Sequence, residues 1–166
     1  KRGWRVRVAV RRPSEAHFVR PYGDVGQVEP IQANIRDEAS TRAAIMGADV
    51  LVSCVGLLYE DSRQKFDGVQ AEGAARIARL ATECGASKLI HLSAIGADAD
   101  SDSNSGRTKA EGGAAVLEAF HPHCKELALG ALKTNIGHTE LAAGLMGMLK
   151  TSLVLRNLNA VANNHM

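Results

Sequence analysis

The first 120 residues alternate between strand-like and helix-like segments, and this alternation constrains the fold more than any single motif. Val6, Val8 and Val10 alternate with arginines, which is the two-residue period of a strand, and Pro13 ends that run. Further strands are predicted at 28–35, 48–56 and 87–96, and helices at 36–47, 66–84 and 107–120. Strands that alternate with helices are typical of βαβ units. The sequence therefore predicts an α/β fold with a parallel sheet and flanking helices.

Local signals predict the ends and buried faces of these elements. Asp37 is the expected N-cap of the first helix, and Gly47 is its expected stop. The run at 48–56 is apolar, which predicts a strand that is covered on both faces. The second helix ends at Gly85 and has one stripe at helical spacing, made of Phe66, Val69, Gly73, Ile77, Leu80 and Cys84. The expected buried side of the third helix consists of Ala110, Ala114, Leu117 and Phe120.

Composition argues against several classes of function. A net charge of +2 and an aromatic content of 4% argue against a nucleic-acid-binding protein. No apolar run approaches the length of a transmembrane helix. Three widely spaced cysteines, Cys54, Cys84 and Cys124, favour neither a disulfide framework nor a CxxC site, so a reducing compartment such as the cytoplasm is expected. His121, His123 and Cys124 lack a partner pair, and no metal site is predicted.

Four segments of the sequence carry a family resemblance when taken in order. They are VEPIQANIRDEAS, ADVLVSCVGLLYE, VQAEGAARIARLATECGASKLIHLSAIGAD and RTKAEGGAAVLEAF. Residues 1–120 resemble extended, atypical short-chain dehydrogenase/reductases of the NAD-dependent epimerase type, above all the group that includes the dehydrogenase-like accessory subunit of respiratory complex I. The resemblance implies a Rossmann-like NAD(P)-binding domain. It also implies a larger respiratory assembly and an organelle matrix as the location.

The resemblance implies a set of cofactor-binding residues. Arg11 and Arg12 follow the strand that meets the adenosine ribose in this family, where guanidinium groups suit the 2′-phosphate of NADP; a solvated strand end is the alternative. Asn34 and Ile35 match the pair that flanks the adenine. The strand end near the ribose is matched by Ser53, Cys54, Val55 and Gly56, where glycine lets the backbone approach the cofactor.

The catalytic positions of the family are matched incompletely. Ser93 matches its strand-end serine and Lys109 its lysine, but Ser105 stands where the family has the tyrosine that exchanges a proton during hydride transfer. The glycine-rich turn that grips the pyrophosphate is also absent from the sequence. The resemblance therefore implies a domain truncated by its first βα unit, with weak or lost NADP or NAD binding and doubtful oxidoreductase activity.

A second resemblance covers the end of the chain. The run LGALKTNIGHTELAAGLMGMLKTSLVLRN is similar to β-ketoacyl synthases, and Lys133 and His138 take the places of their lysine and of the histidine that assists decarboxylation. Condensation also needs a cysteine nucleophile and another histidine, and Cys124 lacks the matching surroundings. We expect residues 121–166 to be a synthase-like fragment whose strand at 126–133 and helix at 139–157 complete the truncated sheet.

Three functions follow as alternatives. The first is an NAD(P)-binding protein of the atypical dehydrogenase or epimerase type, weakened or inactive in this form. The others are a fragment of a polyketide or fatty-acid synthase, which would place the chain in a synthase assembly, and a fusion product without activity. The helix at 139–157 is apolar nearly all round, so self-association is expected if the sheet does not cover it.

Overall fold

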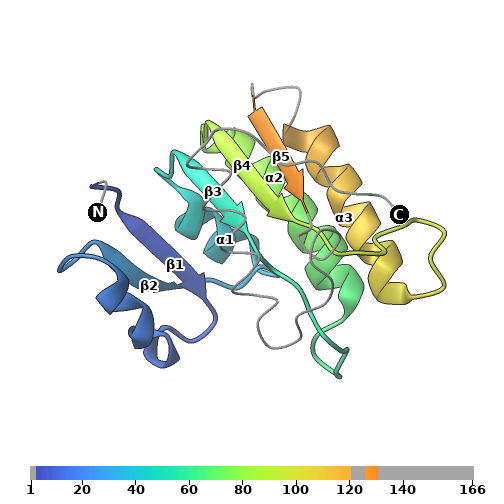
Figure 1. The fold of residues 1–166 in the computed structure, drawn as a ribbon, viewed down its shortest axis with the longest axis horizontal. Helices are drawn as coiled ribbons and strands as arrows, with labels where there is room; N and C mark the ends of the chain where they lie inside the picture. The colour runs from blue at the N-terminus through green and yellow to red at the C-terminus, as the bar shows by residue number, and fades with distance from the viewer. Residues whose placement is uncertain (1–2, 121–125, 131–166) are drawn as a thin grey trace. The chain divides into compact units, whose positions relative to one another are not determined.

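The chain folds into two compact α/β units. A computed structural model describes residues 3–120 and 126–130, and the first unit ends at Met46 where the second begins at Gly47. Each unit contains its own sheet, and every strand pair in the described residues is parallel. Helices alternate with the strands along the chain (Figure 1). The predicted α/β fold with parallel strands and flanking helices is confirmed.

The sheet of the first unit has two strands. β1 (Val6–Val10) pairs in parallel with β2 (Val28–Gln32), in a register that runs from Val6 opposite Val28 to Val10 opposite Gln32. Two 3₁₀ turns, η1 (Pro13–Glu15) and η2 (His17–Tyr22), connect them. Pro13 ends the first strand as predicted, because a proline cannot donate to the ladder but suits the start of a helical turn.

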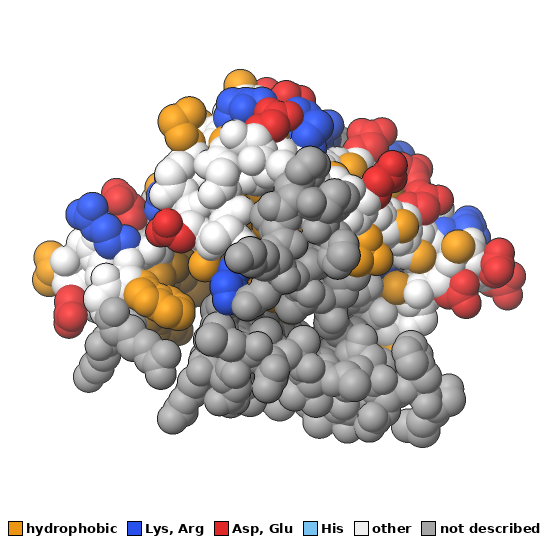
Figure 2. Space-filling view, turned by 90° about the horizontal axis from the view of Figure 1, so that it is seen from above, with side chains coloured by type: hydrophobic (Ala, Val, Ile, Leu, Met, Phe, Trp, Pro, Cys, Tyr) orange, Lys and Arg blue, Asp and Glu red, His pale blue; other side chains and the backbone are white. Residues whose placement is uncertain are grey.

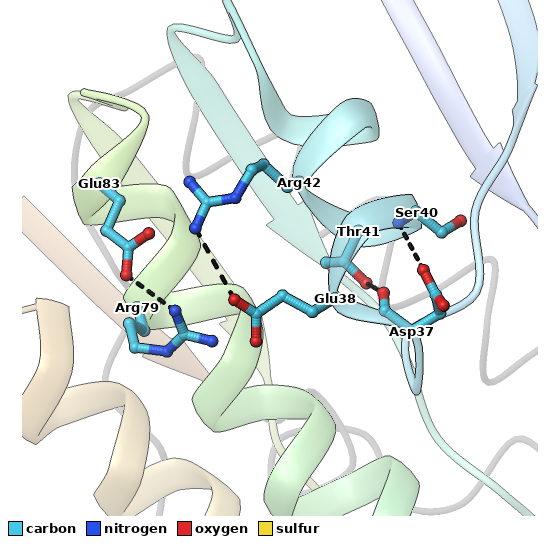
Figure 3. Close-up of polar contacts among 7 residues, drawn as sticks. All are labelled: Asp37, Glu38, Ser40, Thr41, Arg42, Arg79 and Glu83. Carbon is cyan, nitrogen blue, oxygen red and sulfur yellow. Dashed lines mark hydrogen bonds and ion pairs between the residues drawn. The ribbon is translucent and has the colours of Figure 1, made fainter.

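Helix α1 (Glu38–Ile45) follows β2 and has the predicted N-cap. The Asp37 carboxylate accepts a hydrogen bond of 2.6 Å from the Ser40 amide, and the Thr41 hydroxyl donates to the Asp37 carbonyl at 2.7 Å (Figure 3). Gly47 follows the helix with φ +69°, which agrees with its predicted role as a stop. The strand before the helix ends at Gln32 and not at 35, because the Asn34 amide donates to the Ser40 side chain.

The sheet of the second unit has three strands in the order β3-β4-β5. They are β3 (Val50–Ser53), β4 (Lys88–Leu92) and β5 (Glu126–Gly130). β5 pairs with β4 along its whole length, from Glu126 opposite Lys88 to Gly130 opposite Leu92. The prediction that the C-terminal segment adds a strand to the sheet is confirmed for these five residues. The helix predicted at 139–157 lies outside the described residues.

Two helices pack against each other in the second unit. A π-helical turn, η3 (Asp67–Ala71), runs directly into α2 (Glu72–Glu83), and α3 (Asn104–Phe120) packs on both. Small residues let the helices approach closely. The buried core consists of Ala74, Ala78, Ala81, Ala86, Leu89, Val116 and Phe120. The predicted stripe of α2 is confirmed at Val69, Gly73 and Leu80, which are buried, and Gly85 ends the helix with φ +75°.

Two predicted burial patterns are wrong in part. Within the described residues, one face of β3 is packed and the other is not: Leu51 packs against the core, whereas Val50 and Val52 are 40% and 43% exposed. The predicted side of α3 is confirmed at Phe120, which is fully buried, but it is wrong at Leu117, which is 44% exposed while its neighbour Val116 is fully buried. The helix instead buries every fourth residue from Thr108 through Gly112 and Val116 to Phe120. Two of these four are not hydrophobic, so the apolar residues alone indicate the wrong side.

Charged side chains of both signs lie beside one another on the surface. Figure 2 shows basic and acidic groups interspersed on the described part of one face. Arg79 and Glu83 form an ion pair of 2.8 Å one turn apart on α2, and Glu38 and Arg42 form one of 3.7 Å on α1 (Figure 3). Each of these exposed pairs contributes little to stability, on the order of 0.5 kcal/mol.

Candidate functional site

Buried polar side chains gather at one place in the second unit. Six polar or charged residues are buried in the described part of the chain, and all but Thr41 belong to this unit: Ser53, Gln70, His91, Thr108 and Lys109. Ser53 and His91 lie at or near the carboxyl ends of β3 and β4, and the others come from η3 and the first half of α3. In parallel sheets, ligands bind beyond the carboxyl ends of the strands. This cluster is therefore the candidate site.

Lys109 connects helix α3 to the ends of two strands. Its side chain is 8% exposed, and its ammonium nitrogen donates to the carbonyl of Val55 at 2.9 Å and to that of Leu92 at 3.5 Å. A buried ammonium requires such acceptors because it has lost its water. The contacts place a positive charge where β3 and β4 end.

Gln70 joins the π-helical turn to α3. Its amide nitrogen lies 3.3 Å from the hydroxyl oxygens of both Ser105 and Thr108. Thr108 donates its own proton to the carbonyl of Asn104 at 2.9 Å. Because Ser105 accepts a hydrogen bond from Gln70, it keeps its own proton for another acceptor. Gln70 thus orients Ser105, which stands where the family resemblance leads us to expect a tyrosine.

Gly56, in the loop after β3, lies next to the same cluster. A Cβ added at this exposed glycine would lie 3.4 Å from the ammonium nitrogen of Lys109 and 3.8 Å from the side-chain oxygen of Gln70. The strand end that contains Gly56 is therefore next to both side chains. A backbone without a side chain at this point allows a ligand to approach closely.

Cys54 and His91 have pKa values shifted by this environment. Cys54 is exposed by accessible surface, but desolvation by the surrounding protein raises the pKa of its thiol above the ordinary value, and the charge of Lys109 offsets part of that rise. Burial and, to a lesser extent, Lys109 lower the pKa of His91 to about 4. At neutral pH the thiol is therefore protonated and the imidazole is uncharged. Neither group is prepared to act as a nucleophile or a cation.

Ser53 and His91 are cross-strand neighbours, and neither side chain has a hydrogen-bond partner within the described structure. Ser93 follows two residues after His91 and is half-buried. Three residues that the sequence analysis named as site candidates, Ser53, Ser93 and Lys109, therefore lie together near the ends of β3 and β4.

The residues proposed for the adenosine end of the cofactor belong to the first unit. Arg12 is exposed and forms an ion pair of 3.0 Å with Glu15. The side-chain oxygen of Asn34 accepts from the Arg36 amide at 3.2 Å, which closes the turn into α1. Arg11 is exposed and Ile35 is half-buried. In this arrangement a phosphate would compete with Glu15 for Arg12.

Other predicted groups fall beyond these two regions. Lys133, His138 and the cluster His121, His123 and Cys124 lie outside the described residues. Among residues 3–120 and 126–130, no three His, Cys, Asp or Glu side chains are grouped closely enough to hold a metal ion. In the same part of the chain, no helix is long and apolar enough to cross a membrane.

Sequence analysis missed Gln70, Thr108 and His91 as parts of the site. The sequence contains a signal for each of them: all three are polar residues at positions where the helix or strand period predicts a side chain that faces the core. Gln70 adjoins the apolar stripe of the second helix, and His91 alternates with Leu89 on a strand. Thr108 is one helical turn from Gly112. A polar residue at an inward position must find a partner, and this indicates a polar site.

Comparisons with known proteins found a matching family model, similar relatives and similar solved structures. A family model described as NAD(P)H-binding matches residues 1–133. The mitochondrial NADH dehydrogenase (ubiquinone) 1 alpha subcomplex subunit 9 of Dictyostelium discoideum is 33% identical over 102 residues, which cover 61% of this chain and 28% of that protein. The X-ray structure of Pen from Bacillus thuringiensis superposes with a TM-score of 0.60 at 16% identity, covering 69% of this chain and 37% of that one. The latter shows the fold alone, and that fold is Rossmann-like.

A shorter similarity is to a synthase. A phenolphthiocerol/phthiocerol polyketide synthase of Mycobacterium tuberculosis is 42% identical over 50 residues, which cover 30% of this chain and 3% of that protein. The chain spans less than a third of the length of the complex I subunits that it matches. The family match, by contrast, extends over most of the chain and includes the strands, Gly56 and Lys109. This sequence therefore belongs to the NAD(P)H-binding family.

Proposed function

We propose that this chain is part of an NAD(P)H-binding protein of the complex I subunit 9 type, and that Lys109, Gly56 and Ser93 form its cofactor-facing edge. The observation that carries the proposal is the buried Lys109, whose ammonium group binds the carbonyls at the ends of β3 and β4. A fixed positive charge beside an open glycine suits the hydroxyl-rich and anionic surface of a dinucleotide. Arg11, Arg12, Asn34 and Ile35 lie in the first unit, and the family resemblance alone supports the proposal that they contact the adenosine half.

The affinity of the chain by itself is proposed to be low. Its 166 residues contain no Gly-x-Gly sequence, so no glycine-rich turn of the Rossmann type presents amides to the pyrophosphate. The Arg12–Glu15 ion pair further weakens any contact with a 2′-phosphate. Binding of NADP or NAD in the millimolar range is expected.

Catalysis by this site is proposed to be absent. An aliphatic hydroxyl is a much weaker acid than a phenol, so Ser105 cannot replace the tyrosine that exchanges a proton with the substrate. The bond from Gln70 positions Ser105 to donate to a carbonyl or a ribose hydroxyl. The site can therefore bind without supporting hydride transfer.

Titration with NADPH and NADH to millimolar concentration, followed by ¹H–¹⁵N NMR, tests this proposal. The amides of Gly56 and Ser93 should shift, whereas those of Gly85 and Ser87, which precede β4, should not. A thermal-shift assay with the cofactor near its dissociation constant should show only about 0.4 kcal/mol of stabilisation. Absence of shifts at Gly56 and Ser93 would contradict cofactor binding at this site. Binding with micromolar affinity would contradict the proposal that the chain by itself binds the cofactor only weakly.

A matched pair of variants locates the site. Gly56→Val adds bulk at an exposed position whose nearest neighbour is the Lys109 ammonium group, so the fold should survive while the cofactor is kept away. Gly113→Ala on α3, where an added Cβ meets nothing within 4 Å, serves as the control. The NMR shifts should disappear in the first variant and persist in the second. Equal shifts in both would place the cofactor elsewhere.

The partners and location of the protein are proposed from its relatives. Two of the relatives are named as mitochondrial subunits of the NADH-ubiquinone oxidoreductase, which is complex I, so we propose that the protein assembles with a larger respiratory complex in an organelle matrix. A cytoplasmic location fits a free dehydrogenase-like protein. Co-purification of the full-length protein with complex I subunits supports the first location, and its recovery as a free monomer contradicts it.

A second candidate function concerns residues 121–166. The similarity to a polyketide synthase favours a synthase origin for this segment, with Lys133 and His138 as its functional residues and a boundary near 121–126. Because no cysteine with matching surroundings precedes them, the chain is expected not to transfer acyl groups from a malonyl thioester. Release of carbon dioxide from malonyl-pantetheine, lost in His138→Ala, would show instead that the segment keeps synthase chemistry.

A further inference from the structure

Ser53 and His91 form a buried polar pair between the apolar core and Lys109. They lie opposite each other in the register of β3 and β4, one step beyond the core pair Leu51 and Leu89. Side chains on one face of a strand recur every second residue, so this pair continues the face that the helices cover. Ser53 is 4% exposed and His91 is 2% exposed.

Three polar atoms of this pair have no hydrogen-bond partner in the described part of the chain. They are the hydroxyl oxygen of Ser53 and both ring nitrogens of His91. Buried polar atoms in folded proteins are nearly always paired, with protein groups or with ordered water. A hydroxyl and an imidazole on facing strands, both without partners, point to a missing common partner that lies between them.

The two side chains do not form a direct bond with each other, because none of the three atoms has a partner in the described structure. The ring nitrogens of an imidazole point in different directions, so a small partner between the two side chains reaches Ser53 and only one of them. A neutral imidazole offers one donor and one acceptor, and a hydroxyl offers both. The common partner must therefore donate and accept, and it must be small, because both residues are closed to solvent. Lys109 lies close enough to act on His91 electrostatically, which disfavours a second cation here.

We propose that Ser53 and His91 form a binding site for one ordered internal water molecule. The water bridges the Ser53 hydroxyl and one ring nitrogen of His91, and so fixes a single imidazole tautomer. It also ties together the ends of β3 and β4 just before the carbonyls of Val55 and Leu92, which hold Lys109. The water is thus part of the support of the lysine and does not depend on cofactor binding.

Solution NMR on ¹⁵N-histidine-labelled protein tests the site with water itself as the probe. The ring N–H of His91 should be visible, with one tautomer, and should show a nuclear Overhauser effect to a water molecule that resides for longer than nanoseconds. His17 is exposed and should show only rapid exchange. A crystal structure should contain one ordered water within hydrogen-bond distance of Ser53 Oγ and His91.

Matched serine variants show whether the water bridges the pair. Ser53→Ala should abolish the water signal at His91, whereas Ser87→Ala, which removes an exposed hydroxyl bonded to the carbonyl of Asp49, should leave it unchanged. Persistence of the signal in Ser53→Ala would overturn the bridging role. A wild-type protein without a long-lived water at His91, or with a direct Ser53–His91 bond and no ordered water, would overturn the proposal even if no variant folds.

Discussion

Gly112 lies where helix α3 comes closest to the π-helical turn. A Cβ added at Gly112 would overlap the carbonyl oxygen of Gln70 and would lie 3.1 Å from that residue's carbonyl carbon and 3.2 Å from the Cβ of Ala74. A carbonyl oxygen of the backbone cannot rotate away as a side chain can. Gly112→Ala must therefore push α3 away from η3, and this overpacking costs about 1–3 kcal/mol.

The next residue provides a matched control on the same helix. A Cβ at Gly113 meets nothing within 4 Å, so Gly113→Ala should gain only helix propensity, about 0.5–1 kcal/mol. The same propensity gain applies to Gly112→Ala. The difference between the two variants in the free energy of unfolding therefore isolates the packing cost, and it should be on the order of 1–3 kcal/mol.

Urea unfolding monitored by circular dichroism measures both variants against the wild type. Gly113→Ala should unfold at a higher urea concentration than the wild type, and Gly112→Ala at a lower one. Equal stability of the two alanine variants would refute the close approach of α3 and η3. It would also remove the structural basis for the contacts from Gln70 to Ser105 and Thr108.

Three further predictions concern stability. Because the folded pKa of His91 is about 4 and its ordinary value is 6.5, protonation favours the unfolded state; stability should fall by about 3 kcal/mol as pH drops from 6.5 to 4, and His91→Phe should lack this dependence in urea titrations at several pH values. Val116→Ala should lower the free energy of unfolding, measured in urea, by roughly 2 kcal/mol, and Leu117→Ala should lower it much less. The reverse order would support the buried side of α3 that was predicted from the sequence. Asp37→Ala should cost about 1 kcal/mol and Asp37→Asn little, because asparagine also caps helices; equal losses in thermal unfolding would contradict the cap.

Several features of the fold could be predicted because they depend on neighbours in the sequence. The alternation of Val6, Val8 and Val10 is visible in six residues, and the contact of Asp37 with the Ser40 amide spans only three. Glycines at the ends of helices act through their own backbone angles, as the positive φ values of Gly47 and Gly85 show. These signals required no knowledge of the tertiary packing.

Part of the candidate site could also be predicted from the sequence. Lys109, Ser93 and Gly56 were identified because they occur at fixed places in ordered segments that resemble a family. Gln70, Thr108 and His91 have no such signature, and their importance depends on side chains 35 to 38 residues away. The true buried face of α3 was missed because Gly112 is buried for its lack of a side chain, which no hydrophobic pattern records.

The sequence by itself determined the alternation of elements, their caps and stops, and the addition of β5 to a parallel sheet, because periodicity and backbone preference act over a few residues. Only the tertiary structure decided which polar groups share the ends of β3 and β4. Burial makes an unpaired polar atom costly, and it depends on every element that packs around the atom. For that reason the sequence identified Lys109 but not its grouping with Gln70 and His91, which depends on the packing of the helices on the sheet.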